Sequence, residues 1–294
     1  MKLFARRKDS FDYDLQRTCL TCSTEFQGKF CCRCGEKVVD QQDRSIKNFL
    51  SDLLNAFTFL DGKFPTSIKT ILLQPGKLSE DVVRGVRVPY MKPVSLFFVA
   101  NFLYFLLPGS EIFNTSLKSQ LVASPLRQIV ERLVHSRITE RNISFEQFEI
   151  IFNSESSSWA KILIVLIVVL FSLVTALVNF SRSRYYADHL TYAFEFISYV
   201  IVYPVILFFS LTYFIYWIGQ QIGFDLQWLF RDELVFQLPI FSLMIFYFLY
   251  KSEIMFYKTQ RGKALLKTLA LFWGLVGIVL IYRVILFFVT FWSL

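Results

Sequence analysis

Histidine is nearly absent from this chain, which has two among 294 residues, and charged residues make up only 18% of it. The common signatures of catalysis are missing too, since the sequence has no phosphate-binding glycine loop, no His-Glu-x-x-His and no Gly-x-Ser-x-Gly. Two histidines leave little side-chain acid–base chemistry. The sequence therefore names no catalytic residue and does not favour an enzyme.

Other absences bear on location and partners. The first dozen residues, MKLFARRKDSFD, lack the apolar stretch of a secretory signal peptide, so we expect the N-terminus to stay in the cytosol. Inverted repeats and strings of intramembrane carboxylates, which mark many transporters, are also missing. The net charge of +8 could suggest nucleic acid, but the basic residues gather in particular loops, so we predict no nucleic-acid partner.

What the chain has in excess is apolar side chains, with 54% hydrophobic residues, 34 Phe and 14 Tyr. A water-soluble domain of this length has no interior large enough for them. Five apolar segments predict transmembrane helices. The first is short for a bilayer, because its apolar part, residues 94–107 between two prolines, reaches only about 21 Å as a helix. These segments are residues 91–108, 159–180, 190–218, 234–250 and 268–294.

The basic residues decide the number of crossings. Residues 1–92, 181–189 and 251–267 hold 23 of the 31 Lys and Arg. Loops rich in Lys and Arg stay on the cytoplasmic side, and five crossings with the N-terminus inside place these three pieces there together. The prediction is an all-α integral membrane protein with its C-terminus outside. Its bundle covers residues 93–294 and includes an outer loop at 109–158.

A cluster of thiols precedes the apolar segments. Two Cys-x2-Cys pairs separated by eight residues form two tight turns whose thiolates can converge tetrahedrally on Zn²⁺ at roughly 2.3 Å. In a reducing cytosol a disulfide is not expected, so residues 1–40 predict a zinc ribbon with an N-terminal tail. A rubredoxin-like iron site is the alternative. Four protein ligands leave no open position, which makes the metal structural. The ligands are Cys19, Cys22, Cys31 and Cys34, and Cys32 is left as a free thiol.

Residues 41–92 predict amphipathic helices at the membrane interface. One apolar stripe runs from Ile46 to Phe57, and a second short piece from Ile68 to Leu72 ends before Pro75. These helices either lie in the inner interface or pack against the ends of the transmembrane helices. Four residues just before the first crossing either anchor that helix or bind lipid phosphates, which makes membrane lipids a partner. They are Arg84, Arg87, Tyr90 and Lys92.

Ionisable residues within the predicted membrane helices are candidates for function because intramembrane charge is costly. Glu195 and Arg283 lie well inside them. Asp188 and His189 share the inner end of the helix that contains Glu195, so the three predict a polar cluster. Arg182, Arg184 or His189 is close enough in sequence to pair with Glu195. For Arg283, in the outer half, we expect snorkelling or bonds to helix carbonyls.

The order of the motifs resembles a bacterial membrane-protein family known as domain of unknown function 3667. The cysteine ribbon is followed by Pro-Gly and then by Gly-x-Arg-x-x-Tyr-x-x-Pro. The matching residues are Pro75, Gly76, Gly85, Arg87, Tyr90 and Pro93. This resemblance implies a zinc ribbon with about five transmembrane helices in the bacterial inner membrane, and it implies no activity.

These observations favour a noncatalytic inner-membrane accessory or scaffold protein, which docks a protein partner through the zinc ribbon and the interface helices. Two alternatives stay open. One is a transporter or export accessory for lipids or small molecules. The other is a lipid-modifying membrane enzyme, which requires Asp188, His189 and Glu195 to converge on one cavity.

Overall fold

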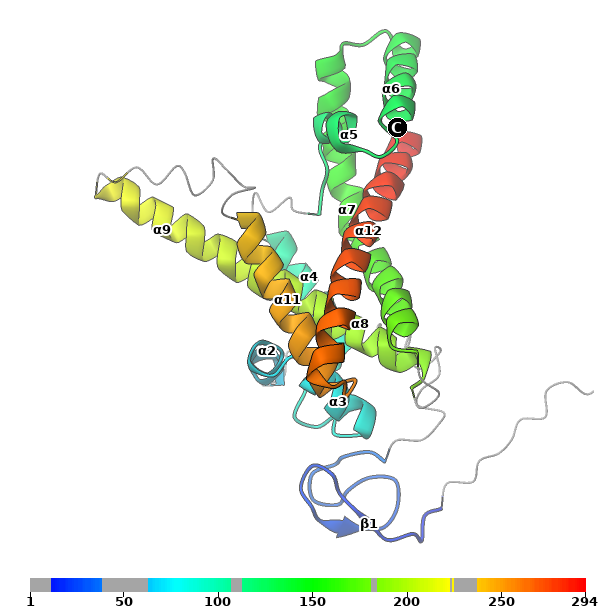
Figure 1. The fold of residues 1–294 in the computed structure, drawn as a ribbon, viewed down its shortest axis with the longest axis vertical. Helices are drawn as coiled ribbons and strands as arrows, with labels where there is room; N and C mark the ends of the chain where they lie inside the picture. The colour runs from blue at the N-terminus through cyan, green and yellow to red at the C-terminus, as the bar shows by residue number, and fades with distance from the viewer. Residues whose placement is uncertain (1–11, 39–62, 107–112, 181–183, 223, 225–236) are drawn as a thin grey trace, which may run out of the picture.

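The computed structural model describes residues 12–38, 63–106, 113–180, 184–222, 224 and 237–294 (Figure 1). The predicted stripe from Ile46 to Phe57 lies outside the described residues. Within them, a two-stranded ribbon is followed by helices. The elements are β1 (Arg17–Thr18), β2 (Glu25–Phe26), α2 (Lys63–Leu73), α3 (Lys77–Arg84), α4 (Pro93–Leu106), α5 (Leu117–Ala123), α6 (Arg127–Arg141), α7 (Phe145–Val178), α8 (Tyr186–Val200), η3 (Ile201–Phe208), α9 (Phe209–Gln221), α11 (Gln237–Met255) and α12 (Arg261–Ser293).

The two longest helices, α7 and α12, pack against each other along the long axis of the molecule (Figure 1). They have 34 and 33 residues, so each is about 50 Å long and exceeds the hydrocarbon thickness of a bilayer. Helix α7 begins at a capping box, in which Ser144 and Gln147 bond each other's backbone N–H groups. Residues 153–158 contain no Gly or Pro, so the helix continues from this box directly into the apolar segment that begins at residue 159.

Helices α8 and α9 form one 36-residue run that passes through a π-helical stretch, η3, with Pro204 inside it. Proline has no N–H to donate and its ring crowds the preceding turn, so a wider turn accommodates it. This run is the most buried of the long apolar helices, with 61% of its apolar window inside the protein against 22–33% for the others. It is therefore the centre of the bundle.

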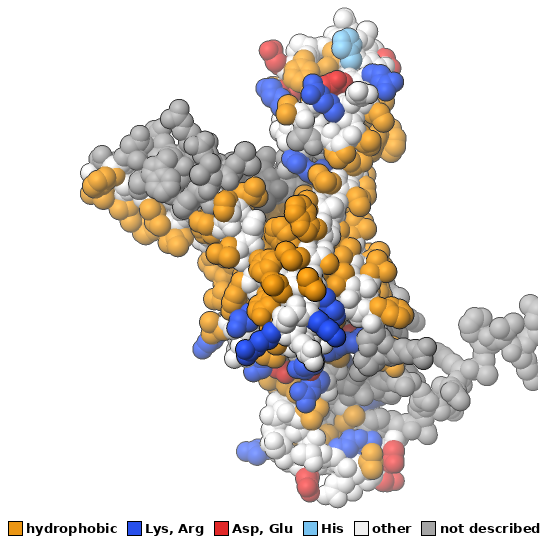
Figure 2. Space-filling view, viewed as in Figure 1, with side chains coloured by type: hydrophobic (Ala, Val, Ile, Leu, Met, Phe, Trp, Pro, Cys, Tyr) orange, Lys and Arg blue, Asp and Glu red, His pale blue; other side chains and the backbone are white. Residues whose placement is uncertain are grey.

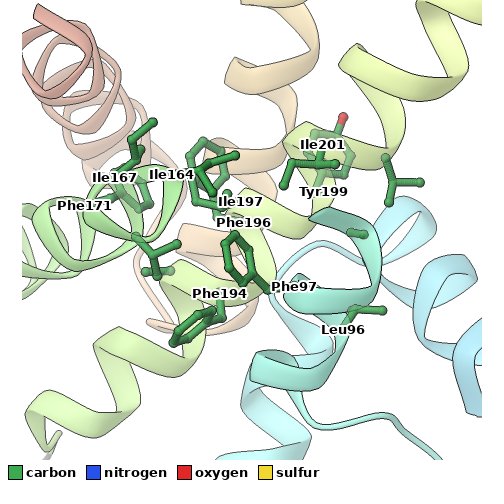
Figure 3. Packing of buried hydrophobic residues seen from close by; sticks show 14 of the residues in the cluster. Leu96, Phe97, Ile164, Ile167, Phe171, Phe194, Phe196, Ile197, Tyr199 and Ile201 are labelled. Atoms are coloured by element: carbon green, nitrogen blue, oxygen red, sulfur yellow. The ribbon is translucent and has the colours of Figure 1, made fainter. Parts of the chain in front are cut away.

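Aromatic side chains fill the space around α8 (Figure 3). Phe171 of α7 stacks on Phe196 with ring centroids 4.4 Å apart, and Phe97 of α4 meets Phe194 edge-on at 5.3 Å. On the α11 side, Phe248 lies 4.6 Å from Tyr199. Rings packed in these geometries add to the stabilisation from their buried area. They join α4, α7 and α11 to α8.

A second, smaller core lies at the end of the molecule opposite the ribbon, where α5 and α6 meet the first turns of α7 and the last turns of α12 (Figure 1). Its buried residues are Leu117, Val130, Val134, Phe148, Phe152, Phe287 and Phe291. The C-terminus of the chain is at this end.

Large apolar side chains are exposed along the middle of the molecule (Figure 2). The most exposed apolar side chains of the long helices include Leu177 of α7 and Trp273 of α12. Four helices are long and apolar enough to cross a membrane, and α4 is a shorter apolar helix. An apolar surface this extensive is what lipid hydrocarbon covers. Basic side chains gather between this surface and the ribbon (Figure 2). The exposed ones include Arg84, Lys92, Lys251, Arg261 and Lys263.

The short helices α2 and α3 are packed onto the ribbon-side end of the bundle. Ile71 and Leu78 are fully buried in the aromatic core, and the Tyr203 hydroxyl donates a hydrogen bond to the backbone oxygen of Ile68, 2.7 Å away. Of the two arrangements that the sequence left open, the structure shows packing against the helix ends for these residues. Gly76 begins α3 in the left-handed region, with φ of +82°.

We expect Gly76→Ala to destabilise the protein by about 2 kcal/mol or more, because a side chain there is strained at positive φ and would overlap α11. A Cβ at this position would lie 2.9 Å from both Cα and Cβ of Ser252. Thermal unfolding in mild detergent measures the loss. Gly262→Ala is the matched control, since a Cβ there meets nothing within 4 Å. Equal melting temperatures for the two variants would contradict the prediction.

Candidate metal centre and its attachment to the helices

The ribbon is built from two hairpin-like turns, each containing one Cys-x2-Cys pair. In the first, β1 and β2 are antiparallel, with Arg17 opposite Phe26. In the second, an isolated bridge joins Phe30 to Lys37. Few side chains are buried in the ribbon, so its shape depends mainly on the hydrogen-bonded backbone turns and on the thiols. The buried ones are Cys19, Phe26 and Cys31.

The two turns repeat the same backbone geometry. The N–H of Ser23 donates to the oxygen of Cys19, and the N–H of Gly35 donates to the oxygen of Cys31, both at 2.9 Å. Ser23 and Gly35 each follow the second cysteine of a pair, and both are left-handed, with φ of +57° and +73°. A left-handed residue at this point turns the chain back, so that both thiols of a pair face the same side.

The four sulfur atoms converge. Sγ of Cys19 lies 3.4 Å from Sγ of Cys34, Sγ of Cys22 lies 3.6 Å from Sγ of Cys31, and all four are within 4.8 Å of one another. The edge of a tetrahedron with metal–sulfur bonds of about 2.3 Å is roughly 3.8 Å, so the donor set fits a single metal ion. A disulfide would need about 2.05 Å. Cys32 is exposed and lies outside the cluster.

The electrostatics of Cys22 favour metal binding. Hydrogen bonds with the side chain and backbone of Thr24 lower the pKa of the Cys22 thiol to about 6. The thiolate is the form that ligates metals. Cys34 differs, because its backbone hydrogen bond with Glu36, which lowers the pKa, is outweighed by burial and by hydrogen bonds with the other three thiols, which raise the pKa of Cys34 to about 12. The cluster is therefore only partly in the thiolate form before a metal binds.

Glu36, which directly follows the second turn, attaches the ribbon to the helices. Its carboxylate accepts hydrogen bonds from the backbone N–H of Arg87 at 3.0 and 3.1 Å, from that of Val88 at 3.0 Å, and from the hydroxyl of Thr21 at 2.6 Å. Glu36 is only 6% exposed. A buried carboxylate is stable only when it is hydrogen-bonded or paired, and these three donors satisfy that need.

Glu195 makes the corresponding contact from the bundle side. This fully buried carboxylate accepts the backbone N–H of Gly76 at 2.9 Å and of Ser79 at 2.8 Å, at the start of α3. The first N–H groups of a helix have no partner within the helix and favour negative charge. Glu195 therefore caps α3 from 119 residues away. Of the partners suggested by the sequence, Arg184 and His189 are bonded to other groups, and Arg182 lies outside the described residues.

The predicted polar cluster does not converge. Asp188 accepts the backbone N–H of Tyr185 at 3.0 Å, as a cap of its own helix. His189 Nδ1 is hydrogen-bonded to the hydroxyl of Tyr257 at 2.8 Å. Because the Glu195 carboxylate is bonded to the start of α3, each of the three residues is bonded to a different group.

Arg283 connects α12 to the helices at the end opposite the ribbon. Its guanidinium donates to the hydroxyls of Ser119 at 2.9 Å and Thr115 at 3.3 Å, and its backbone oxygen accepts from the Gln120 side chain at 2.9 Å. The sequence suggested snorkelling or helix carbonyls as its partners. The structure instead shows hydroxyl groups around α5, so Arg283 joins two elements.

The four residues proposed for lipid contact divide into two pairs. Arg84 and Lys92 are exposed at the ribbon-side end. Arg87 gives its backbone N–H to Glu36, and the Tyr90 hydroxyl donates to Asp81 at 2.9 Å. Burial, together with Asp81, raises the pKa of Tyr90 to about 12, so the hydroxyl stays protonated as a donor. The second pair thus serves the internal structure of the loop.

Sequence reasoning missed a buried network that joins α7, α11 and α12 at the ribbon-side end. The side-chain N–H of Asn179 donates to Glu253, and Lys267 donates to the Asn179 oxygen, both at 2.6 Å. Glu253 and Lys267 were assigned to loops because the predicted helices stopped at 250 and began at 268. The helices run further, which places both residues inside them.

A second missed group is the ion pair between α3 and the rest of the bundle. Glu80 lies 2.9 Å from Arg184 and 3.4 Å from Lys258. Arg184 also lies over the ring of Phe256, 4.0 Å from its centroid. The acidic residue and its partners are more than 100 positions apart in sequence, so no local pattern signalled the pairing.

A family model described as "Protein of unknown function (DUF3667)" matches residues 61–105, which confirms the predicted resemblance. No curated protein and no solved structure matches the chain. The matched residues contain α2, α3 and all but the last residue of α4. They also contain both pairs of backbone amides that bind carboxylates, one pair for Glu195 and one for Glu36. The segment similar to the family model is therefore the one that joins the ribbon to the bundle.

We expect Cys31→Ser to abolish metal binding, because three thiolates with a neutral hydroxyl make a much weaker site than four thiolates. Elemental analysis of the purified protein should find about one ion per chain in the unmodified protein. Cys32→Ser is the matched control, since Cys32 is adjacent but outside the cluster, and it should keep the metal. Equal metal content in the two variants would contradict the assignment of Cys31 as a ligand.

Proposed function

We propose that this chain is a noncatalytic scaffold of the bacterial inner membrane that presents a cytosolic zinc ribbon to a protein partner. The observation that carries this proposal is the attachment of the ribbon by Glu36, which fixes it on the bundle while large apolar side chains stay exposed. Tyr13, Leu15, Leu20 and Phe30 are 60%, 53%, 61% and 58% exposed.

The arrangement of the ends supports five crossings. The ribbon and the C-terminus lie at opposite ends of the molecule (Figure 1), and this arrangement supports an odd number of crossings. We assign four crossings to the four long apolar helices and propose the shorter apolar helix α4 as the fifth. The short α4 is packed against α8 by Phe97, and a locally thinner bilayer accommodates its length. The exposed basic residues beside the ribbon support a cytosolic N-terminus.

Zinc is the metal that best suits the ribbon. Four thiolates in a closed tetrahedral set are the typical donors of structural Zn²⁺. The buried core of the ribbon is three residues, Cys19, Phe26 and Cys31, which is too little to hold a fold in water. Metal binding would therefore supply most of the folding free energy of this part.

The exposed residues of the ribbon support a protein partner. Four large apolar side chains outside a core of three buried ones are unusual on a water-facing module, and such residues mark interaction sites. The polar residues that an enzyme would need are engaged elsewhere, since Asp188, His189 and Glu195 each bond a different group. Membrane lipids are the second partner, with Arg84 and Lys92 near headgroup phosphates.

The topology is tested by reporters at the two ends of the chain. A reporter that is active only in the cytosol should work when fused before Met1 and fail when fused after Leu294. A reporter that is active only outside should give the opposite pattern, because the ends are on different sides. Fusions to residue 263, in the basic first turn of α12, are the control and should behave like those at Met1. Both ends reporting from one side would contradict the five crossings.

The partner is tested by cross-linking in cells followed by purification in mild detergent. We expect a stoichiometric partner that is lost in the double variant Leu20→Asp, Phe30→Asp, since charge on an apolar contact surface is costly to bury. Both side chains are exposed, so the metal content should not change. Val122→Asp, an exposed apolar position on α5, is the control and should keep the partner. A protein recovered alone, or a partner kept by the double variant, would count against the proposal.

A further inference from the structure

The position of Glu36 depends on both metal-binding turns of the ribbon. Its backbone oxygen accepts the N–H of Cys31 at 2.8 Å, which makes it part of the second turn. Its carboxylate accepts the hydroxyl of Thr21 at 2.6 Å, and Thr21 stands between Cys19 and Cys22 in the first turn. The carboxylate is thus oriented by two loops that share little buried surface and are joined mainly through the four sulfurs.

The receiving side is rigid by comparison. Arg87 and Val88 follow the end of α3. Gly85 ends this helix in the left-handed conformation, and its N–H donates to the backbone oxygens of Asp81 and Val82. The Arg87 side chain donates back to the oxygen of Val82, and Tyr90 is fixed on Asp81. Two successive backbone N–H groups that point at one carboxylate form a small anion-binding nest. The nest keeps its shape through contacts within the helical segment.

We propose that the cysteine cluster and Glu36 form a metal-dependent latch between the ribbon and the helices. With metal bound, both turns keep Glu36 on the amides of Arg87 and Val88. Without metal, the turns lose their cross-link, Glu36 is no longer oriented by Thr21 and Cys31, and the ribbon leaves the helical segment. This regulation goes beyond the docking of a partner and does not depend on it.

Hydrogen exchange of the full chain in detergent or lipid nanodiscs tests the latch, because the contact is made by two backbone amides. After metal is removed with a chelator, the amides of Arg87 and Val88 should exchange roughly tenfold faster or more, as expected for the loss of hydrogen bonds to a charged group. The amides of Gly76 and Ser79, which Glu195 binds, should keep their exchange rates. Adding Zn²⁺ back should restore protection.

Glu36→Ala separates the latch from the metal. This variant should keep its metal, and its amides at Arg87 and Val88 should exchange as fast as in the stripped protein. Glu25→Ala is the matched control, since Glu25 is an exposed carboxylate of the same ribbon, and it should change neither metal content nor exchange. Protection at Arg87 and Val88 that persists in the stripped protein or in Glu36→Ala overturns the latch. Faster exchange at Gly76 and Ser79 after chelation also overturns it, because the metal would then stabilise the whole segment.

Discussion

The structure depends on backbone amides that bind carboxylates from two directions. Gly76 and Ser79 bind Glu195 of α8, and Arg87 and Val88 bind Glu36 of the ribbon. Both carboxylates are buried, where an unsatisfied charge would cost several kcal/mol. Each contact is therefore strongly favoured once the elements are in place, and the short segment between them, with α3 at its centre, joins the ribbon to the bundle.

Helix α3 exists because of these contacts. Eight residues are too few for a stable helix in water. Its start is capped by Glu195, its end is closed by Gly85, and Glu80 is paired with Arg184 and Lys258. These partners come from α8, the segment before α8 and the turn before α12. The family motif, with Pro-Gly at one end of α3 and Gly-x-Arg at the other, thus marks the two boundaries of a helix that its surroundings stabilise.

The sequence predicted features whose signal is local and missed those made by distant residues. The spacing of Cys19, Cys22, Cys31 and Cys34 along one short stretch of the chain was enough to predict their convergence. Glu36 gave no signal because its partners lie 51 and 52 residues away. The roles of Glu195 and Arg283 were open for the same reason. Lys267 and Glu253 were missed because hydropathy shows only the apolar part of a helix. Helices α11 and α12 continue beyond their apolar parts and include these two charged residues.

The distribution of buried polar groups argues for a rigid connector. At the ribbon-side end, Glu195 and the network of Glu253, Asn179 and Lys267 join α3, α7, α8, α11 and α12. At the other end, Arg283 joins α12 to α5. Between them lies a core of aromatic and aliphatic side chains. Polar contacts of defined geometry at both ends fix the register of the helices, whereas the packed rings between them resist bending. A bundle built in this way suits a protein that holds one module in place relative to another.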